Sequence, residues 1–212
     1  MDNLHKMRQE YMSGNLNEEL MPQDPMQMFK MWFSEAIETG LTEPNAMTVA
    51  TASLDGKPSA RVVLLKEVNN MGFVFFTNYL SRKGREITVN PEVALVFDWH
   101  DMERQVRVEG RAEKLPVEDS DAYFNSRPED AKIGAWASPQ SKIVKNRDEL
   151  EKLEDESMEQ FEDMEVHRPS HWGGYLIRPS VIEFWQGRPN RMHDRIVYYN
   201  TEEGWSMHRL AP

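Results

Sequence analysis

The feature that most constrains the fold is a change from helical to alternating spacing at Ala46. From there AMTVATAS leads through LDGKP into SARVVLLK, and Asp55-Gly56 is a dipeptide typical of a β-hairpin turn. Further segments have the composition of strands: GFVFFTN, EVALVFDW, RQVRVEGRAEKL, GGYLIRP, VIEFWQG, DRIVYYN and GWSMHRL. Many short strands with tight turns, and helices at the margins, predict an α+β protein built on an antiparallel β-barrel.

Helical patterns surround this β region. Asp24-Pro25 predicts a helix start, because Asp is a good N-cap and proline is tolerated at the first helical position. Apolar residues then recur at helical spacing, at Phe29, Trp32, Phe33, Ala36 and Ile37, so this helix is predicted to pack on the core. Residues 1–23 are polar and unpatterned, which predicts an arm that is flexible until something binds it, followed by a single domain over 24–212.

Other helices are predicted farther along the chain. SRKGREITVN predicts a short helix that ends before Asn90-Pro91, and PVEDSDAYFNSRPEDAKIGAW predicts two more. The acidic run DELEKLEDESMEQFEDMEV predicts a solvated helix with one buried edge, formed by Leu150, Leu153, Met158, Phe161 and Met164.

Charge and composition argue against several classes of function. A formal net charge of −11 and a pI near 5.1 argue against a nucleic acid or anionic membrane bound through overall charge. The absence of cysteine excludes disulfides, thiolate catalysis and cysteine-ligated metals, and fits a reducing cytoplasm. The apolar runs are too short to span a bilayer. No metal site is predicted, because His167 and His171 do not lie in a helical pattern and no third ligand accompanies them.

Against this acidic background, FWQGRPNRMHDR (184–195) gathers three arginines and a histidine beside a tryptophan. Such a local excess of cations indicates a pocket for an anion or an electron-rich ring. SRKG (81–84), which follows a strand and opens a helix, is either a phosphate cradle or a solvated turn. Tyr123 and Arg127, at i and i+4, either fork a phosphate or form a surface cation–π pair.

Three further positions have two interpretations each. Gln105 shares a strand face with Arg107, where its amide either reads a polar heteroring or faces solvent. Arg61 and Lys66 are five residues apart on one predicted strand, so either alternation places them on opposite faces, with one of them structural, or a bulge or bend brings them to one face. From these patterns alone, the chain is interpreted as a small β-barrel that binds a phosphorylated aromatic ligand.

A set of motifs then occurs together and in order: RVVLLK (61–66), FTN with SRK (76–83), ERQVRVEG (103–110), YFNSRP (123–128), GAWASPQS (134–141), HWGG (171–174), EFWQGRPNRMHDR (183–195) and RLAP (209–212). This set resembles the pyridoxamine 5′-phosphate oxidase family and covers nearly the whole chain from the first helix onward. The terminal RLAP and the WQG…R.HDR block are its most specific parts.

The resemblance implies a fold and a reaction. The implied fold is an FMN-binding split β-barrel that forms a homodimer, with two FMN sites at the subunit interface. The implied reaction is the oxidation of pyridoxamine or pyridoxine 5′-phosphate by O₂ to pyridoxal 5′-phosphate, with release of hydrogen peroxide.

The resemblance also assigns residues. The implied FMN contacts are Arg61, Val62, Val63, Leu64, Leu65, Lys66, Phe76, Thr77, Arg82, Lys83 and Gln105, with Gln140, Ser141, Trp185 and Arg195 from the other subunit. The implied substrate contacts are Lys66, Tyr123, Arg127, Arg191 and His193, with Arg8 and Tyr11 as lid residues; Arg191 and His193 are also the implied catalytic residues. No role is implied for Arg188.

One position departs from the family pattern. Ala131 stands four residues after the matching Arg127, where family members often carry a serine that helps to hold the substrate phosphate. Two alternatives of other classes remain open at this stage. One is a flavin-binding split-barrel protein of other redox specificity, and the other is a non-enzymatic carrier of pyridoxal phosphate.

Overall fold

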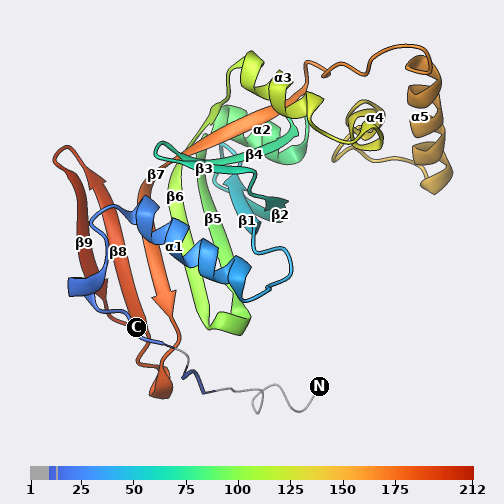
Figure 1. The fold of residues 1–212 in the computed structure, drawn as a ribbon. Helices are drawn as coiled ribbons and strands as arrows, with labels where there is room; N and C mark the ends of the chain where they lie inside the picture. Colours follow the sequence, from blue (N-terminus) through green and yellow to red (C-terminus); the bar gives the residue numbers. More distant parts are fainter. Residues whose placement is uncertain (1–9, 13) are drawn as a thin grey trace.

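A single antiparallel sheet organises the molecule (Figure 1). The structure is a computed structural model that describes residues 10–12 and 14–212. The strands of the described chain are β1 (Ala46–Ala52), β2 (Pro58–Leu64), β3 (Glu67–Asn69), β4 (Gly72–Asn78), β5 (Glu92–Trp99), β6 (Arg104–Lys114), β7 (Trp172–Gln186), β8 (Asp194–Thr201) and β9 (Gly204–Leu210). Their order is β2-β1-β5-β6-β7-β4-β3, and the β8–β9 hairpin is added to β7.

The sheet curls into the predicted split barrel. Asp55-Gly56 turns β1 into β2, with Gly56 at a positive φ of 79°, a conformation that glycine adopts without steric cost. β2 then passes through Leu65 and Lys66 into β3, which pairs with β4, and the Lys66 N–H donates to the Val74 carbonyl at 2.8 Å. Because β4 also pairs with β7, the two ends of the strand order approach each other.

β7 is the central strand, and it differs from the prediction. GGYLIRP and VIEFWQG, expected as two segments, form one strand of 15 residues that pairs with β4, β6 and β8. The register shifts between Glu109 and Gly110 on β6, opposite Pro179. Proline has no N–H to donate to a ladder, so this irregular position accommodates it without ending the strand.

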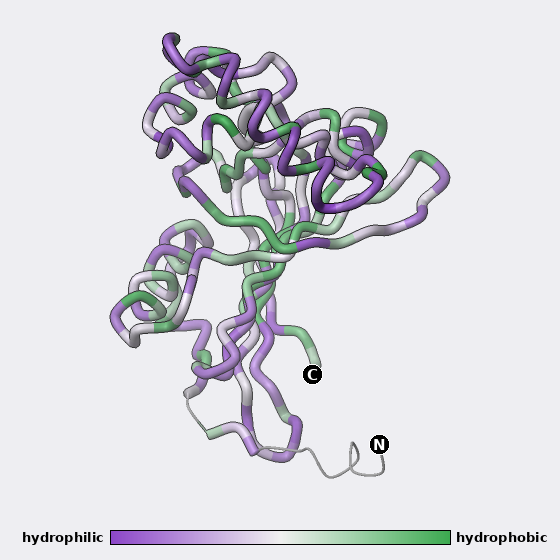
Figure 2. The backbone as a smooth tube through the Cα atoms, turned by 90° about the vertical axis from the view of Figure 1, so that its right-hand side faces the viewer, coloured by the Kyte–Doolittle hydropathy of each residue, from purple (hydrophilic) through white to green (hydrophobic). Residues whose placement is uncertain are grey.

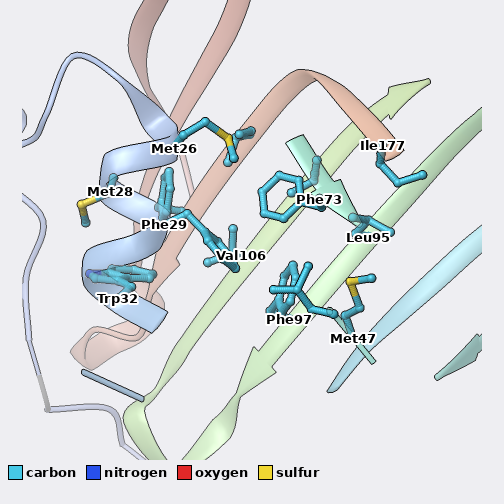
Figure 3. Packing of buried hydrophobic residues seen from close by; sticks show 14 of the residues in the cluster. Met26, Met28, Phe29, Trp32, Met47, Phe73, Leu95, Phe97, Val106 and Ile177 are labelled. Carbon is cyan, nitrogen blue, oxygen red and sulfur yellow. The ribbon is translucent and has the colours of Figure 1, made fainter. Parts of the chain in front are cut away.

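Helix α1 (Pro25–Glu38) covers one face of the sheet and builds the main core (Figures 1 and 3). The Asp24 carboxylate accepts the Met26 N–H at 2.9 Å, and Pro25 occupies the first turn, as predicted. Phe29 and Trp32 are buried against aromatic residues of the strands, among them Phe73 and Phe97. Ile37, predicted to share this face, is 54% exposed.

Of the remaining helices, the first contributes Ile87 to this core. They are α2 (Arg82–Val89), α3 (Val117–Asn125), α4 (Glu129–Ala137) and α5 (Arg147–Gln160), with short 3-10 turns η2 (Glu18–Leu20), η3 (His100–Met102) and η4 (Pro189–Arg191). α5 is hydrophilic along most of its length (Figure 2). Of its predicted apolar edge Phe161 is buried, but Met158 and Met164 are exposed, so that expectation is wrong for both. Within the described residues, no helix is long and apolar enough to cross a membrane.

Candidate functional site

The start of α2 brings cations together. Ser81 is fully buried, and its hydroxyl accepts the Gly84 N–H at 3.2 Å, which caps the helix. The helix backbone packs tightly here, because a Cβ on Gly84 would lie 2.2 Å from the Tyr79 carbonyl oxygen. The hydroxyl expected to join a phosphate cradle is therefore used within the helix, and the adjacent Lys83 is directed into the protein.

Lys83 is a buried cation. It is 9% exposed, and its Nζ donates to Thr77 Oγ1 and to Gln140 Oε1, each at 2.9 Å. Among the ion pairs of the described chain, none gives Lys83 a carboxylate partner. Burial, and then the charge of Arg61, lower the pKa of Lys83 to about 8. A cation held in this way has the electrostatics of a site that accepts an anion.

Glu86 pairs with the other two cations of this cluster, Arg61 and Arg82. Its carboxylate accepts from Thr51 and Ser59 at 2.5 Å and from Arg82 Nε at 2.8 Å, and it lies 3.6 Å from Arg61. Burial alone would raise the pKa of Glu86, but hydrogen bonds from Ser59, Thr51 and Arg82 outweigh it and lower the pKa to about 2. Arg61, Arg82 and Lys83 therefore carry three positive charges against the one negative charge of Glu86, and Lys83 is the cation without a carboxylate partner among the described residues. Sequence analysis missed Glu86, although its i, i+4 spacing from Arg82 is a readable signal.

Arg127 forms a second, half-buried cationic site nearby. Its guanidinium lies over the Trp172 ring at 4.6 Å, and its Nη1 is buried without a hydrogen-bond partner. Burial lowers the pKa of Arg127. The cation–π contact predicted with Tyr123 is made with Trp172 and Phe124 instead, while Tyr123 stacks on Phe76 at 3.8 Å.

A pocket of about 230 Å³ lies at Arg127. Gln140 lines this pocket and also accepts the hydrogen bond from Lys83. The remaining lining residues are Asn78, Arg127, Ala131, Gly134, Ala135, Ser138 and Trp172. Gln140, expected from the other subunit, thus contacts Lys83 within one chain. Ser141, which follows, is exposed and has a positive φ of 69°.

A row of residues crosses the sheet elsewhere. Gln105 on β6 pairs with Trp185 on β7, and Trp185 pairs with Arg195 on β8. Their strand neighbours Val106, Phe184 and Ile196 point into the main core, so this row occupies the opposite face from α1. The strand register thus aligns three of the implied FMN contacts, although Gln105 and Trp185 are 80 residues apart in sequence.

Arg195 is fixed by an acid that sequence analysis did not identify. Glu183 is 6% exposed and accepts from Arg195 Nε at 2.7 Å and Nη2 at 3.1 Å, and it also pairs with Arg107 at 3.1 Å. The third partner of Arg195 is the Ala211 carbonyl, at 3.1 Å from Nη1. Hydrogen bonding to Glu183 raises the pKa of Arg195. The second hydrogens of Nη1 and Nη2 remain available to a ligand.

An aromatic group borders this row. Tyr11 contacts Trp185 and His193, with ring centroids 5.6 Å apart in each case, and Trp185 lies 4.8 Å from His193. The Arg188 N–H donates to His193 Nδ1 at 3.1 Å, so the neutral ring carries its proton on Nε2. Tyr11, Gln105 and Trp185 also line a pocket of about 200 Å³. Arg191 is exposed on η4, with a positive φ of 60°.

Other implied residues lie apart from these groups. Lys66 lines a different pocket, of about 380 Å³, with Phe33 and Ile37 of α1. Val62 is 67% exposed on β2 and Leu65 is buried, while Val63 and Leu64 are half-buried. Arg8 lies outside the described residues. Among the described residues, no hydrogen bond, ion pair or ring contact joins the Lys83–Arg127 region to the Gln105–Trp185–Arg195 row.

Comparison with known proteins identifies the family. A family model described as "Pyridoxamine 5′-phosphate oxidase" matches residues 33–156, and one described as "Pyridoxine 5′-phosphate oxidase C-terminal dimerisation region" matches residues 172–212. The chain is 52% identical to the pyridoxine/pyridoxamine 5′-phosphate oxidase of Salinibacter ruber over 215 residues, covering all of both chains. It is 51% identical to the protein of the same name from a Cyanothece strain, covering 97% of each.

Solved structures share the fold. PhzG from Burkholderia lata, in complex with tetrahydrophenazine-1-carboxylic acid, matches with a TM-score of 0.88 and 27% identity, covering 95% of this chain and all of that one. An FMN-binding, pyridoxamine 5′-phosphate oxidase-related protein from Nostoc punctiforme matches with a TM-score of 0.70 and 16% identity, covering 91% of this chain and all of that one. The sheet, the sequence matches and the length of the alignments agree, and the chain therefore belongs to the pyridoxine/pyridoxamine 5′-phosphate oxidase family.

Proposed function

We propose that this protein oxidises pyridoxine 5′-phosphate and pyridoxamine 5′-phosphate to pyridoxal 5′-phosphate, with FMN as cofactor and O₂ as the electron acceptor. Curated relatives about half identical over the whole chain carry the name of this oxidase, which supports the reaction class. The finer assignment rests on the chemistry of the two cationic sites.

The observation that carries the proposal is a pair of cations, the buried Lys83 bonded to Gln140 and the half-buried Arg127 that lines one pocket with Gln140. Lys83 has no carboxylate partner in the described chain, and Arg127 has a buried Nη1 without a hydrogen-bond partner. The reaction brings two phosphate monoesters together, one on FMN and one on the substrate. Two adjacent sites that each lack an anion fit that requirement, because phosphate oxygens supply both charge and acceptors.

The chain offers a matching set of groups for FMN. Lys83 and Arg61 would hold the phosphate, with Thr77 and Arg82 beside them. Gln105, Trp185 and Arg195 would hold the ring system through an amide, an aromatic face and a guanidinium. Trp185 and Arg195 lie in the segment that matches the dimerisation region. We therefore propose a homodimer in which each FMN site combines Gln105, Trp185 and Arg195 of one subunit with Lys83 of the other.

Substrate would be held by its phosphate and its ring. Arg127 and Tyr123 would bind the phosphate, with Lys66 contributed as the family resemblance implies. Ala131 lines the same pocket and supplies no hydroxyl. His193, with Nδ1 accepting from Arg188, presents its Nε2 proton toward a ligand, and Arg191 would add charge and donors to the same side.

FMN, when bound, would supply a two-electron acceptor for the hydride of substrate C4′, and O₂ would take up those electrons with two protons as hydrogen peroxide. The alcohol substrate also loses its hydroxyl proton, giving the aldehyde. The amine substrate gives an imine, which water hydrolyses to the aldehyde and ammonia. His193 Nε2 or the Arg191 guanidinium would hold the substrate oxygen or nitrogen as its proton departs.

The direct test is an aerobic assay of the purified, FMN-loaded protein. With pyridoxine 5′-phosphate we expect one pyridoxal 5′-phosphate and one hydrogen peroxide for each O₂ consumed. Absence of the aldehyde product with both phosphorylated substrates would rule out the proposed function. Light scattering on the same sample should give a dimer, and an FMN-loaded monomer would contradict the shared site.

A further inference from the structure

Arg188 joins the N-terminal segment to the FWQGRPNRMHDR loop. Its Nη1 donates to the Gly14 carbonyl at 2.8 Å, across 174 residues of sequence. Its Nε lies 3.5 Å from Asp194 Oδ2, and its side chain is 38% exposed. The family resemblance gives this arginine no role, yet its long-range contact shows that it does more than face solvent.

Asp194 extends this connection. Its Oδ2 also accepts the Leu16 N–H at 3.1 Å, and its Oδ1 accepts from Arg209 Nη1 at 2.5 Å. Arg209 in turn donates to the Leu16 carbonyl at 2.8 Å and binds the Glu18 carboxylate. The hydrogen bond from Arg209 lowers the pKa of Glu18 to about 2. Side chains from the C-terminal hairpin and its loop thus bind both polar groups of the Leu16 backbone.

Tyr11 lies next to this anchorage, and the same segment is also held where the Met12 N–H donates to the Glu103 carboxylate at 2.8 Å. Tyr11 is only three residues before Gly14, and its ring packs on Trp185 and His193. The fit is close, because a Cβ on Gly187 would lie 2.6 Å from Tyr11 Cγ, and one on Gly14 would lie 3.1 Å from Gln186 Oε1. Arg188 is next to Gly187 and also orients His193 through its main-chain N–H.

We propose that Arg188 is a positioning residue: its side chain anchors the N-terminal segment at Gly14 so that Tyr11 covers Trp185 and His193. This inference rests on the proposed function, because it assigns Tyr11 a place beside bound substrate. Arg188 itself contacts neither Trp185 nor the buried cations in the described chain, so it acts through the segment that it holds.

The test compares Arg188→Ala and Arg188→Lys with Arg178→Ala in the FMN-loaded protein. Arg178 is a matched control, since it is also a half-exposed arginine with one carboxylate partner, Glu113. In Arg188→Ala, hydrogen exchange of the Leu16 amide should quicken by a factor on the order of ten, because one charge-assisted anchor is lost. Lysine can still donate to the Gly14 carbonyl, so Arg188→Lys should restore most of the protection.

Steady-state kinetics supply the second measurement. Arg188→Ala should raise KM for pyridoxine 5′-phosphate by a factor on the order of five to ten with little change in kcat, because a covering contact serves ground and transition states alike. Arg188→Lys and Arg178→Ala should remain close to wild type in both constants.

The two measurements separate the possible failures. Unchanged exchange at Leu16 in Arg188→Ala would overturn the inference whatever the activity. Faster exchange with an unchanged KM would also overturn it, while leaving the proposed function intact. A wild-type protein that forms no pyridoxal 5′-phosphate would instead overturn the proposed function, and the exchange result would still decide whether Arg188 anchors the segment.

Discussion

Replacing Lys83 by Met should stabilise the protein without ligand and weaken its binding of FMN. Burial and Arg61 lower the pKa of Lys83 from 10.5 to about 8. This pKa difference corresponds to about 3 kcal/mol of unfavourable free energy for keeping Lys83 protonated in the folded chain below pH 8. Met fills similar volume without charge. It also gives up the hydrogen bonds to Thr77 and Gln140, so we expect a net gain of about 1–3 kcal/mol at pH 7.

The sign of the pH dependence follows from the lowered pKa. Between pH 8 and 10.5 the unfolded chain binds more protons at Lys83 than the folded chain does. Lys83 should therefore make the free energy of unfolding of the ligand-free protein increase as pH rises through this window. FMN binding should show the opposite trend, weakening above pH 8 by up to about tenfold per pH unit as Lys83 loses its proton.

Two assays on the apoprotein measure these effects. Urea unfolding gives stability, and quenching of flavin fluorescence gives the Kd for FMN, which should rise about 10- to 150-fold in Lys83→Met through loss of a charge-assisted contact. Lys57→Met is the matched control, because Lys57 is 79% exposed and pairs with Asp55, and its effects should be small. A Lys83→Met protein that is less stable than wild type, or that binds FMN equally well, would refute this reasoning.

Other substitutions test neighbouring parts of the site. Ala131→Ser adds a hydroxyl to the pocket of Arg127 and should lower KM for the phosphorylated substrates with little change in kcat; an unchanged KM would mean that another group already binds the phosphate there. Arg191→Met should leave flavin content near wild type while kcat/KM falls by a factor on the order of a hundred to a thousand, whereas Arg195→Met should weaken FMN retention or slow anaerobic flavin reduction. If both variants behave like wild type, the substrate and flavin roles assigned to the FWQGRPNRMHDR loop are wrong. Glu86, with a pKa lowered from 4.5 to about 2, contributes stability above pH 4.5 that is lost as pH falls toward 2. Glu86→Gln should accordingly be less stable than wild type by about 3 kcal/mol at pH 7 in urea unfolding, and equal stability would contradict the role of Glu86 as the shared anion.

Sequence reasoning succeeded where the signals are local. Asp24-Pro25 marks a helix start through a side chain that caps an N–H two residues later, and this cap is present. The β1–β2 hairpin likewise follows from Asp55-Gly56. Pro179 misled the prediction for β7, because a proline that would interrupt a regular ladder lies at a register shift opposite Gly110.

The site could be predicted only in part. The cations and the aromatic residues of the site were identified from the sequence. Glu86 and Glu183, the acids that pair with its arginines, were not. Glu183 becomes important only because β6, β7 and β8 bring Arg107 and Arg195 to it. Arg188 has no local signal, since its partner Gly14 is joined to it by the fold alone. The contact between Gln140 and Lys83 was missed for the same reason, because it spans 57 residues.

The measurement that tests the central claim most directly is the visible spectrum of the purified protein under anaerobic conditions. We predict a yellow, FMN-containing protein whose flavin absorbance bleaches when pyridoxine 5′-phosphate is added and returns when O₂ is admitted, with one pyridoxal 5′-phosphate formed per flavin. A colourless protein that cannot be loaded with FMN, or an FMN-loaded protein whose spectrum is unchanged by both pyridoxine and pyridoxamine 5′-phosphate, would contradict the account.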